Sequence, residues 1–185
     1  MFPLAQTDGV ALVWSREGFR GDWELKWGAE KIGHLLAVPE RKGFGEAGTG
    51  EEAWVFFERG TWKRRTFLAT REGLELGSFK PDGIKGTLEM ADGRRLLWEA
   101  PDQWEREWGF SAGGEQLFRM VRDPRIAGSA HVPTDARVDV NPRYLREPAL
   151  PLVLLFGGYL FATRPLVEKF KPEKVREPSW NLDEV

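Results

Sequence analysis

The segment Pro148–Thr163 contains no charged residue, and it restricts the possible folds more than any other part of the chain. Glu147 precedes this segment and Arg164 follows it, an order of charges that suits the dipole of a helix over Ala149–Thr163. Prolines near its start are tolerated in a first helical turn, and Pro165 predicts a stop or a kink. A helix that is apolar on every side must be surrounded by apolar material.

That surrounding material is either lipid or protein, and the length of the segment favours protein. A membrane-spanning helix needs about 20 apolar residues, whereas runs of about 10–14 are more often buried core helices. The uncharged run falls between these limits and contains Gly157 and Gly158. Each glycine costs a helix about 1 kcal/mol, which close packing against a sheet would offset. The segment therefore predicts a helix enclosed in the protein core.

The preceding part of the chain, from residue 22 to about residue 140, alternates polar and apolar residues in short runs separated by Gly, Asp or Pro. About nine to eleven strands are expected, at the spacing of 8–12 residues that is typical of sandwiches and barrels. No run is long enough for a crossover helix, so the sheet must be mainly antiparallel, and a sheet of this size tends to close. The expected strands are Asp22–Trp27, Ile32–Val38, Ala53–Phe57, Trp62–Thr70, Leu74–Phe79, Ile84–Met90, Arg95–Glu99, Gln103–Phe110, Glu115–Val121 and one or two within Gly128–Val140.

Several connections between these runs carry turn sequences. Pro81-Asp82-Gly83 presets a turn, and Asp92-Gly93 between two alternating runs is a strong hairpin signal. Ser111–Gly114 predicts a second hairpin, and Glu58–Thr61 is expected to connect two further strands.

The amino-acid composition limits the kinds of partner and of chemistry that this chain can have. With 27 basic and 29 acidic residues the chain has a formal net charge of −2, which provides no general attraction for nucleic acid, so none is expected as a partner. There is no cysteine, which excludes disulfides and thiolate chemistry. The first residues lack the pattern of a signal peptide, so a cytoplasmic location, or a peripheral one at a membrane, is expected. The nine tryptophans favour a Trp-rich β body over a stacking site for bases or sugars.

The order of elements, a meander of short strands and then one wholly apolar helix, resembles the tubby C-terminal-like superfamily, which includes the phospholipid scramblase-like and LURP-one-related proteins. This resemblance implies a closed antiparallel barrel of about twelve strands wrapped around the helix at about 149–163. It implies a barrel domain over residues 1–165 and leaves 166–185 as a charged C-terminal extension. The residues that carry it are Leu76–Phe79, Gly86–Leu88, Asp92–Arg94, Trp104–Phe110, Gly114–Phe118 and Leu150–Phe161.

No group of residues indicates a reaction, so no catalytic residue, metal site or cofactor is predicted. The Gly-x-Gly-x-x-Gly pattern within Arg41–Gly50 precedes an apparent strand instead of a helix, which favours a mobile hairpin loop over a phosphate site. His131, Asp135 and Asp139 would share one strand face, but each would stand about 13 Å from the next, too far for one metal ion. His34 lies in an apolar run and is expected to be interior.

Lys63, Arg64 and Arg65 form the most concentrated basic cluster in the expected sheet. Because neighbours on a strand alternate faces, Lys63 and Arg65 would share one face and Arg64 would point to the other, unless the strand is bulged. The resemblance implies that these residues bind phospholipid head groups. The alternative is an outer face on which they pair with the abundant glutamates.

Three classes of function remain open from the sequence. The first is a non-catalytic binding or structural module of tubby/scramblase-like form, with an anionic phospholipid or a protein as partner. The second is a membrane-anchored, scramblase-like protein in which the 149–163 segment spans the bilayer. The third is a ligand carrier or an enzyme without a recognisable site, which a barrel filled by its own helix disfavours.

Overall fold

The computed structural model describes residues 12–17, 22–37, 43–61, 64–100, 107–122 and 135–163. The described parts form twelve strands and one α-helix. The strands are β1 (Leu12–Glu17), β2 (Asp22–Trp27), β3 (Glu30–Ala37), β4 (Phe44–Gly48), β5 (Ala53–Arg59), β6 (Arg65–Thr70), β7 (Glu75–Asp82), β8 (Lys85–Met90), β9 (Arg95–Glu99), β10 (Glu107–Ala112), β11 (Glu115–Arg122) and β12 (Asp135–Val140).

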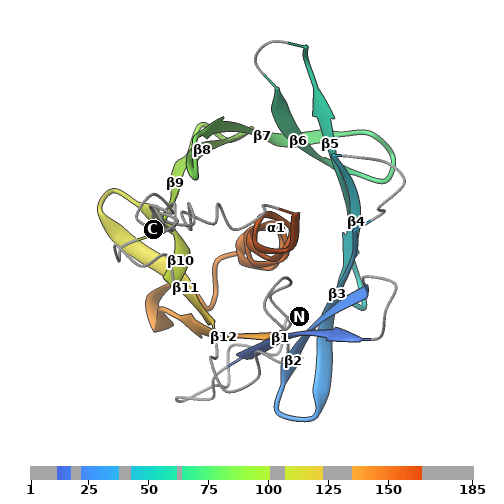
Figure 1. The fold of residues 1–185 in the computed structure, drawn as a ribbon, viewed down its shortest axis with the longest axis vertical. Helices are drawn as coiled ribbons and strands as arrows, with labels where there is room; N and C mark the ends of the chain where they lie inside the picture. Colours follow the sequence, from blue (N-terminus) through green and yellow to red (C-terminus); the bar gives the residue numbers. More distant parts are fainter. Residues whose placement is uncertain are drawn as a thin grey trace, which may run out of the picture.

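The strands form one closed antiparallel barrel in which every strand pairs with its neighbours in the chain (Figure 1). The closing pair is β1 with β12, where Leu12 stands opposite Val138 and Trp14 stands opposite Ala136. Short turns between consecutive strands make this meander possible, and closure leaves no sheet edge unpaired. The expected fold class, a mainly β closed barrel with one apolar helix, is confirmed.

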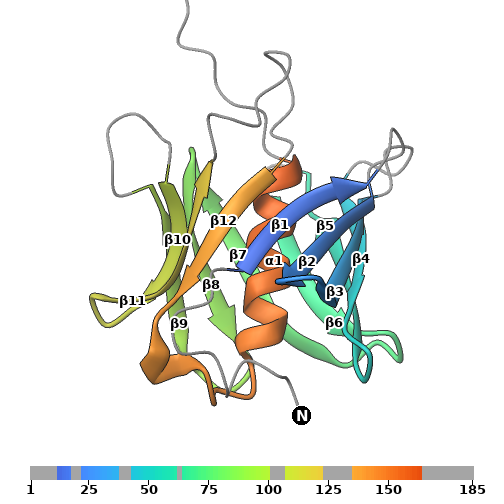
Figure 2. The same cartoon turned by 90° about the horizontal axis from the view of Figure 1, so that it is seen from below.

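The helix α1 (Leu150–Thr163) runs along the inside of the barrel, surrounded by strands (Figures 1 and 2). It begins one residue later than predicted, and every residue from Leu150 to Phe161 is buried. A helix buried all round needs apolar side chains on all faces, which explains the uncharged sequence. Within the described part of the chain, no helix has the length and hydropathy needed to cross a membrane.

The glycine pair of α1 allows the barrel wall to approach the helix, as the sequence predicted. A β-carbon at Gly157 would lie 2.7 Å from Cζ of Phe118 and 3.3 Å from Cζ3 of Trp98. A β-carbon at Gly158 would overlap the indole ring of Trp14. The large aromatic rings of the wall therefore occupy the space that a side chain at either position would need.

On another side of the helix, aromatic rings fill the barrel. The ring of Phe156 contacts those of Phe56, Phe79 and Phe110, with ring centroids 5.2, 5.5 and 6.2 Å apart. Tyr159 extends this cluster at 5.3 Å from Phe56. Tryptophans also contribute to this core. Among those described, Trp14, Trp23, Trp54 and Trp98 are buried, as expected for a Trp-rich β body.

The Gly-x-Gly-x-x-Gly segment is a strand, and the expectation of a mobile loop was wrong. Gly43 begins it and β4 follows directly, paired with β3 and β5. A β-carbon at Gly45 would lie 2.8 Å from Cδ2 of Tyr159, so a larger residue would collide with the helix. Glycine is needed in this strand because the helix packs closely against it. The low intrinsic strand propensity of glycine gives no sign of that requirement.

Three smaller expectations also need correction. The strand β1 was not predicted, although it closes the barrel. Glu58 and Arg59 lie in β5 and not in a turn. His34 is exposed on the outer face and not interior, because its β3 neighbours Gly33 and Leu35 take the inward positions.

The chain between β12 and α1 is fastened to the end of the barrel. Glu115 accepts hydrogen bonds from Nη1 of Arg143 at 2.8 Å, from the hydroxyl of Tyr144 at 3.1 Å and from Nδ2 of Asn141 at 3.4 Å. These residues flank and form a short 3₁₀ turn, Pro142–Tyr144. Closer to the helix, Arg94 donates to Glu147 at 2.6 Å. The strand hairpins thus hold the connection that directs α1 into the barrel.

Candidate functional site

The barrel interior has no room for a ligand, because the helix α1 fills it. Leu152–Phe156 and Tyr159 of α1 fill the space against core side chains from around the wall. Barrels that carry ligands keep their interior open, whereas this one is occupied by its own chain. The two places that remain for a site are the outer surface of the sheet and the mouth of the barrel.

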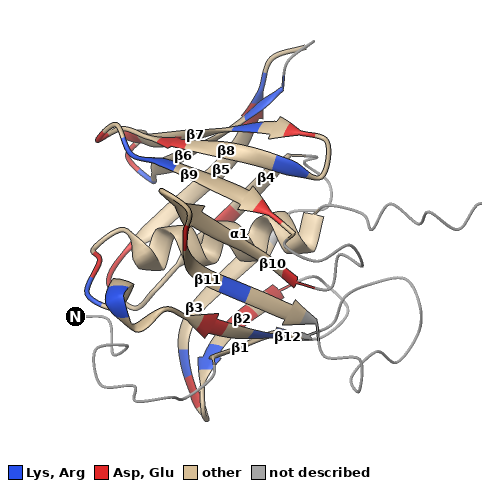
Figure 3. Ribbon diagram, turned by 90° about the vertical axis from the view of Figure 1, so that its left-hand side faces the viewer, with Lys and Arg blue, Asp and Glu red and all other residues tan. Residues whose placement is uncertain are grey.

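On the outer surface, the hairpin formed by β5 and β6 projects outward from the barrel wall, as the β2–β3 hairpin does on the opposite side (Figure 1). Its cross-strand partners run from Trp54 and Thr70 to Arg59 and Arg65. Phe56 is fully buried, so the alternate residues of β5 face outward. Figure 3 shows basic segments at the projecting end of this hairpin.

Of the predicted basic cluster, the structure describes two residues. Arg65 opens β6 on the outer face, and its Nη1 lies 3.7 Å from Oε2 of Glu89. Arg64 is exposed at the end of the hairpin, with Nη1 at 3.7 Å from Oε2 of Glu58. Lys63 lies outside the described residues. Both ion pairs are long and solvent-exposed, and such pairs contribute only about 0.2–1 kcal/mol, so they leave the arginines able to contact other anions.

Three further residues of this hairpin were not predicted as part of a site. The outward-facing rings of Phe57 and Phe67 stack across the two strands at 5.9 Å and 16°. The guanidinium carbon of Arg59 lies 4.6 Å from the ring centroid of Phe57 and 5.3 Å from that of Phe67. The sequence predicted that this strand ends at Phe57, so Arg59 was not expected beside the rings. Continuing the period-two pattern to Arg59 would have placed Phe57 and Arg59 on one face of this strand, but only the register shows that Phe67 and Arg65 lie beside them.

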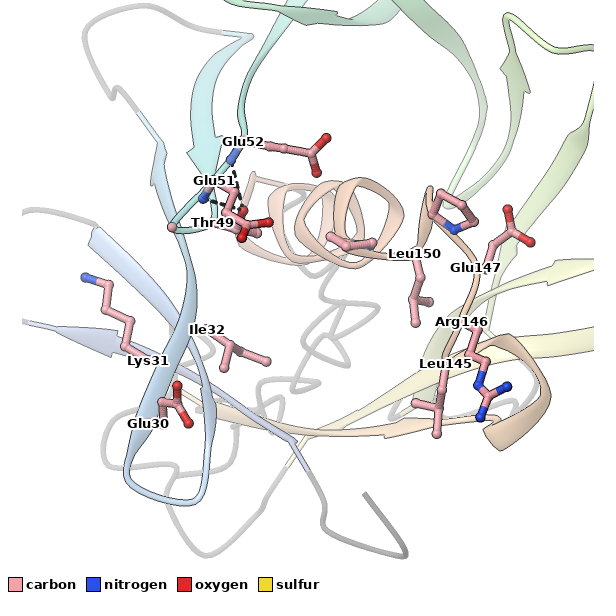
Figure 4. A pocket seen from close by; sticks show the side chains of 13 residues that line it. Glu30, Lys31, Ile32, Thr49, Glu51, Glu52, Leu145, Arg146, Glu147 and Leu150 are labelled. Carbon is pink, nitrogen blue, oxygen red and sulfur yellow. Dashed lines mark hydrogen bonds between the residues drawn. The ribbon is translucent and has the colours of Figure 1, made fainter. Parts of the chain in front are cut away.

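At the barrel mouth, where α1 begins, there is a pocket of about 890 Å³ (Figure 4). Its apolar lining is Ile32, Leu145 and Leu150 with two prolines, and its rim is contributed by the start of β3, the β4–β5 turn and the chain before α1. In Figure 4, Glu51 and Glu52 stand on one side, with Thr49 accepting hydrogen bonds from their backbone N–H groups at 3.3 and 3.2 Å. The charged lining residues are Glu30, Lys31, Glu51, Glu52, Arg146 and Glu147.

Two of these charges are engaged outside the pocket. The Nζ of Lys31 contacts Glu24 at 2.5 Å, and Glu147 is held by Arg94. A hydrogen bond from Lys26, and a second, weaker contribution from the hydrogen bond of Lys31, hold the pKa of Glu24 below its ordinary value. The remaining charged lining residues are three carboxylates, those of Glu30, Glu51 and Glu52, together with Arg146. The rim therefore carries both signs of charge and does not converge on one type of ligand.

The other residues considered from the sequence do not come together. Asp139 pairs with Arg119 at 3.1 Å and with Arg137 at 2.9 Å on the outer wall, and His131 lies outside the described residues. Across the described segments, no three His, Cys, Asp or Glu side chains are arranged to hold a metal ion. The β4 backbone pairs with strands on both sides, so its N–H groups do not form a phosphate loop.

No family model, curated protein or solved structure matches this chain. The geometry of the β5–β6 hairpin and of the mouth pocket is therefore the basis for a function. The hairpin has the more consistent chemistry, because Arg59 and Arg65 are cross-strand partners, Arg64 directly precedes Arg65, and these three arginines outnumber the nearby acid of the same hairpin, Glu58.

Proposed function

We propose that this protein is a non-catalytic binding module of tubby/scramblase-like form that attaches to anionic phospholipid surfaces through its β5–β6 hairpin. It would act in the cytoplasm, at the periphery of a membrane. The observation that carries the proposal is the position of the cations: with the barrel interior occupied by α1, Arg59, Arg64 and Arg65 stand together on a hairpin that projects from the wall.

Because the chain as a whole is slightly acidic, only the basic end of the hairpin can attract an anionic membrane. The whole chain has a net charge of −2 and would not be drawn to an anionic bilayer. Each basic side chain near an anionic membrane surface contributes about 1 kcal/mol, and this attraction falls off within a Debye length of about 10 Å. The hairpin end can therefore bind while the more acidic parts of the barrel stay beyond the range of repulsion.

The packing of α1 supports this proposal over the alternative in which the 149–163 segment is the membrane anchor. Phe156 is fully buried among rings of the wall, and Gly158 lies against Trp14. Moving the helix into lipid would open the barrel and expose those rings to water. Binding through the hairpin needs no such rearrangement.

Vesicle co-sedimentation tests the proposal. The wild-type protein should sediment with phosphatidylcholine vesicles that contain phosphatidylserine and not with phosphatidylcholine alone. The Lys63→Glu/Arg65→Glu variant, alone or with Arg64→Glu, should lose most of this binding. The matched control, Arg137→Glu/Arg143→Glu, changes the net charge as much as the double variant does, on β12 and the turn after it, and should bind like the wild type. Equal binding by all variants, or none by the wild type, would contradict the proposal.

A further inference from the structure

Arg59 and Arg65 stand directly opposite each other on β5 and β6. Residues at opposite positions of an antiparallel pair share a face, with β-carbons about 4.5–5.5 Å apart, and like charges placed there repel each other. The next pair along the same face is Phe57 with Phe67. The hairpin thus presents a stacked aromatic pair followed by a pair of like charges, and an anion bound between the arginines would relieve their repulsion.

The aromatic pair fixes one of the two arginines. Because the Arg59 guanidinium lies over both rings, it is held in place by cation–π attraction and loses little freedom on binding. A lysine would lack the planar group with its fork of donors that matches a phosphate oxygen pair. The observed contacts therefore favour arginine specifically, and not just a positive charge.

Neighbouring carboxylates leave this pair incompletely neutralised. Within the described part of the chain, Arg59 forms no ion pair with a carboxylate. Arg65 is 3.7 Å from Glu89, which is itself shared with Arg95 at 3.8 Å. An anion with more than one negative charge and several acceptor oxygens would satisfy both guanidinium groups.

We propose that Arg59 and Arg65 together grip the phosphate monoester of a membrane lipid, so that the hairpin recognises a phosphate group and not only negative surface charge. The source is a bilayer lipid and not a soluble phosphate, because the pair lies on a projecting hairpin beside outward-facing aromatic rings, where a flat surface can reach it. This inference rests on the proposed function and adds to it the chemistry that is recognised.

Vesicles of two compositions separate recognition of phosphate from general attraction. One set contains phosphatidic acid in phosphatidylcholine, and the other contains phosphatidylserine at the fraction that gives the same zeta potential. The wild-type protein should bind the phosphatidic acid vesicles roughly tenfold more tightly, as bidentate charge-assisted hydrogen bonds would provide. Arg59→Lys should abolish this preference and leave binding to phosphatidylserine nearly unchanged.

Two further variants define the roles of the ring pair and of charge. Phe67→Leu keeps an apolar side chain but removes the ring beneath Arg59, and it should reduce the preference for phosphatidic acid. Arg95→Lys, a charge-conserving change on the same outer wall, is the matched control and should keep the wild-type preference. Melting temperatures of all variants show whether each one is folded.

The outcomes distinguish this inference from the proposed function. Equal binding to both vesicle types at equal potential, or a preference retained by Arg59→Lys, overturns the phosphate site while leaving charge-driven attachment in place. No binding to either vesicle overturns both. Full competition by glycerol 3-phosphate at concentrations near that of the lipid would show a soluble phosphate site and overturn the assignment to a membrane lipid.

Discussion

Gly158 of α1 lies against the indole ring of Trp14, so close that a β-carbon on Gly158 would be 2.6 Å from Cε2 of that ring. Trp14 is itself stacked on Trp23, with centroids 6.0 Å apart and planes at 16°. The ring cannot move aside without displacing a second buried tryptophan. The helix and this part of the wall therefore match only if position 158 has no side chain.

A larger residue in the glycine pair should destabilise the fold. Gly157→Leu places new carbon atoms where Phe118 and Trp98 lie, and overpacking of this kind typically costs about 1–3 kcal/mol. Denaturant unfolding followed by tryptophan fluorescence measures the free energy of unfolding. Gly50→Leu, in a turn where a β-carbon meets no atom within 4 Å, is the control and should change it little. Unchanged stability of Gly157→Leu would mean that the helix is not enclosed.

Acid should weaken the fold partly through Glu24. Hydrogen bonds from Lys26 and Lys31 lower the pKa of Glu24 in the folded protein, so its stabilising contribution is present above a pH of about 4.5 and is lost as the pH falls through the lowered pKa. Glu24→Gln should be less stable at neutral pH and should lose less stability between neutral and acidic pH. The measurement is the unfolding midpoint in denaturant across that range. Glu30→Gln, at an exposed position at the start of β3, should keep the wild-type slope.

Glu115 should determine the local stability of the connection that leads into α1. Its carboxylate accepts hydrogen bonds from Arg143, Tyr144 and Asn141, which lie on or beside that connection. Glu115→Ala should speed amide hydrogen exchange between 141 and 147, because opening this segment then breaks fewer contacts. Exchange in β5 and β6 should stay slow. Equal protection of 141–147 in variant and wild type would show that Glu115 does not hold the connection.

His34 should titrate below the ordinary range of histidine. Partial burial lowers the pKa of His34 first, and the positive charges of Lys31 and Arg71 lower it further. Protonation therefore favours the unfolded chain, and stability should fall as the pH drops below about 6.5. Arg71→Gln should raise the pKa of His34, as measured from the imidazole proton shifts by NMR. Arg143→Gln, which is not among the charges that act on His34, should leave the titration unchanged.

The alternating runs between Asp22 and Val140 predicted most strands because their pattern is local. The segment Arg95–Glu99 was predicted with its observed bounds, since Asp92-Gly93 marks the preceding turn and the inward residues Leu96 and Trp98 are strictly alternate. By contrast, Phe44–Gly48 looked like a loop, because its inward residues are Gly45 and Ala47. Gly45 has to be small because Tyr159, more than 100 positions later in the chain, lies against it, and no local pattern contains that information.

The candidate site likewise has one part that local sequence predicts and one part that depends on contacts between strands. Lys63, Arg64 and Arg65 are recognisable as a basic cluster because they are adjacent in the sequence. Arg59 was assigned to a turn, and its role depends on the register that sets it opposite Arg65 and over two rings. Pairing across strands can turn scattered charges into one binding surface, and it becomes visible only once the register is known.

The sequence by itself determined that this chain forms an antiparallel β structure around one apolar helix, because alternation, turn residues and an uncharged segment with a glycine pair are properties of neighbouring residues. The tertiary structure decided which strands close the barrel, which wall the helix approaches and which cations share a face. These depend on contacts between residues far apart in the chain, where the shape of one side chain sets the size that another can have.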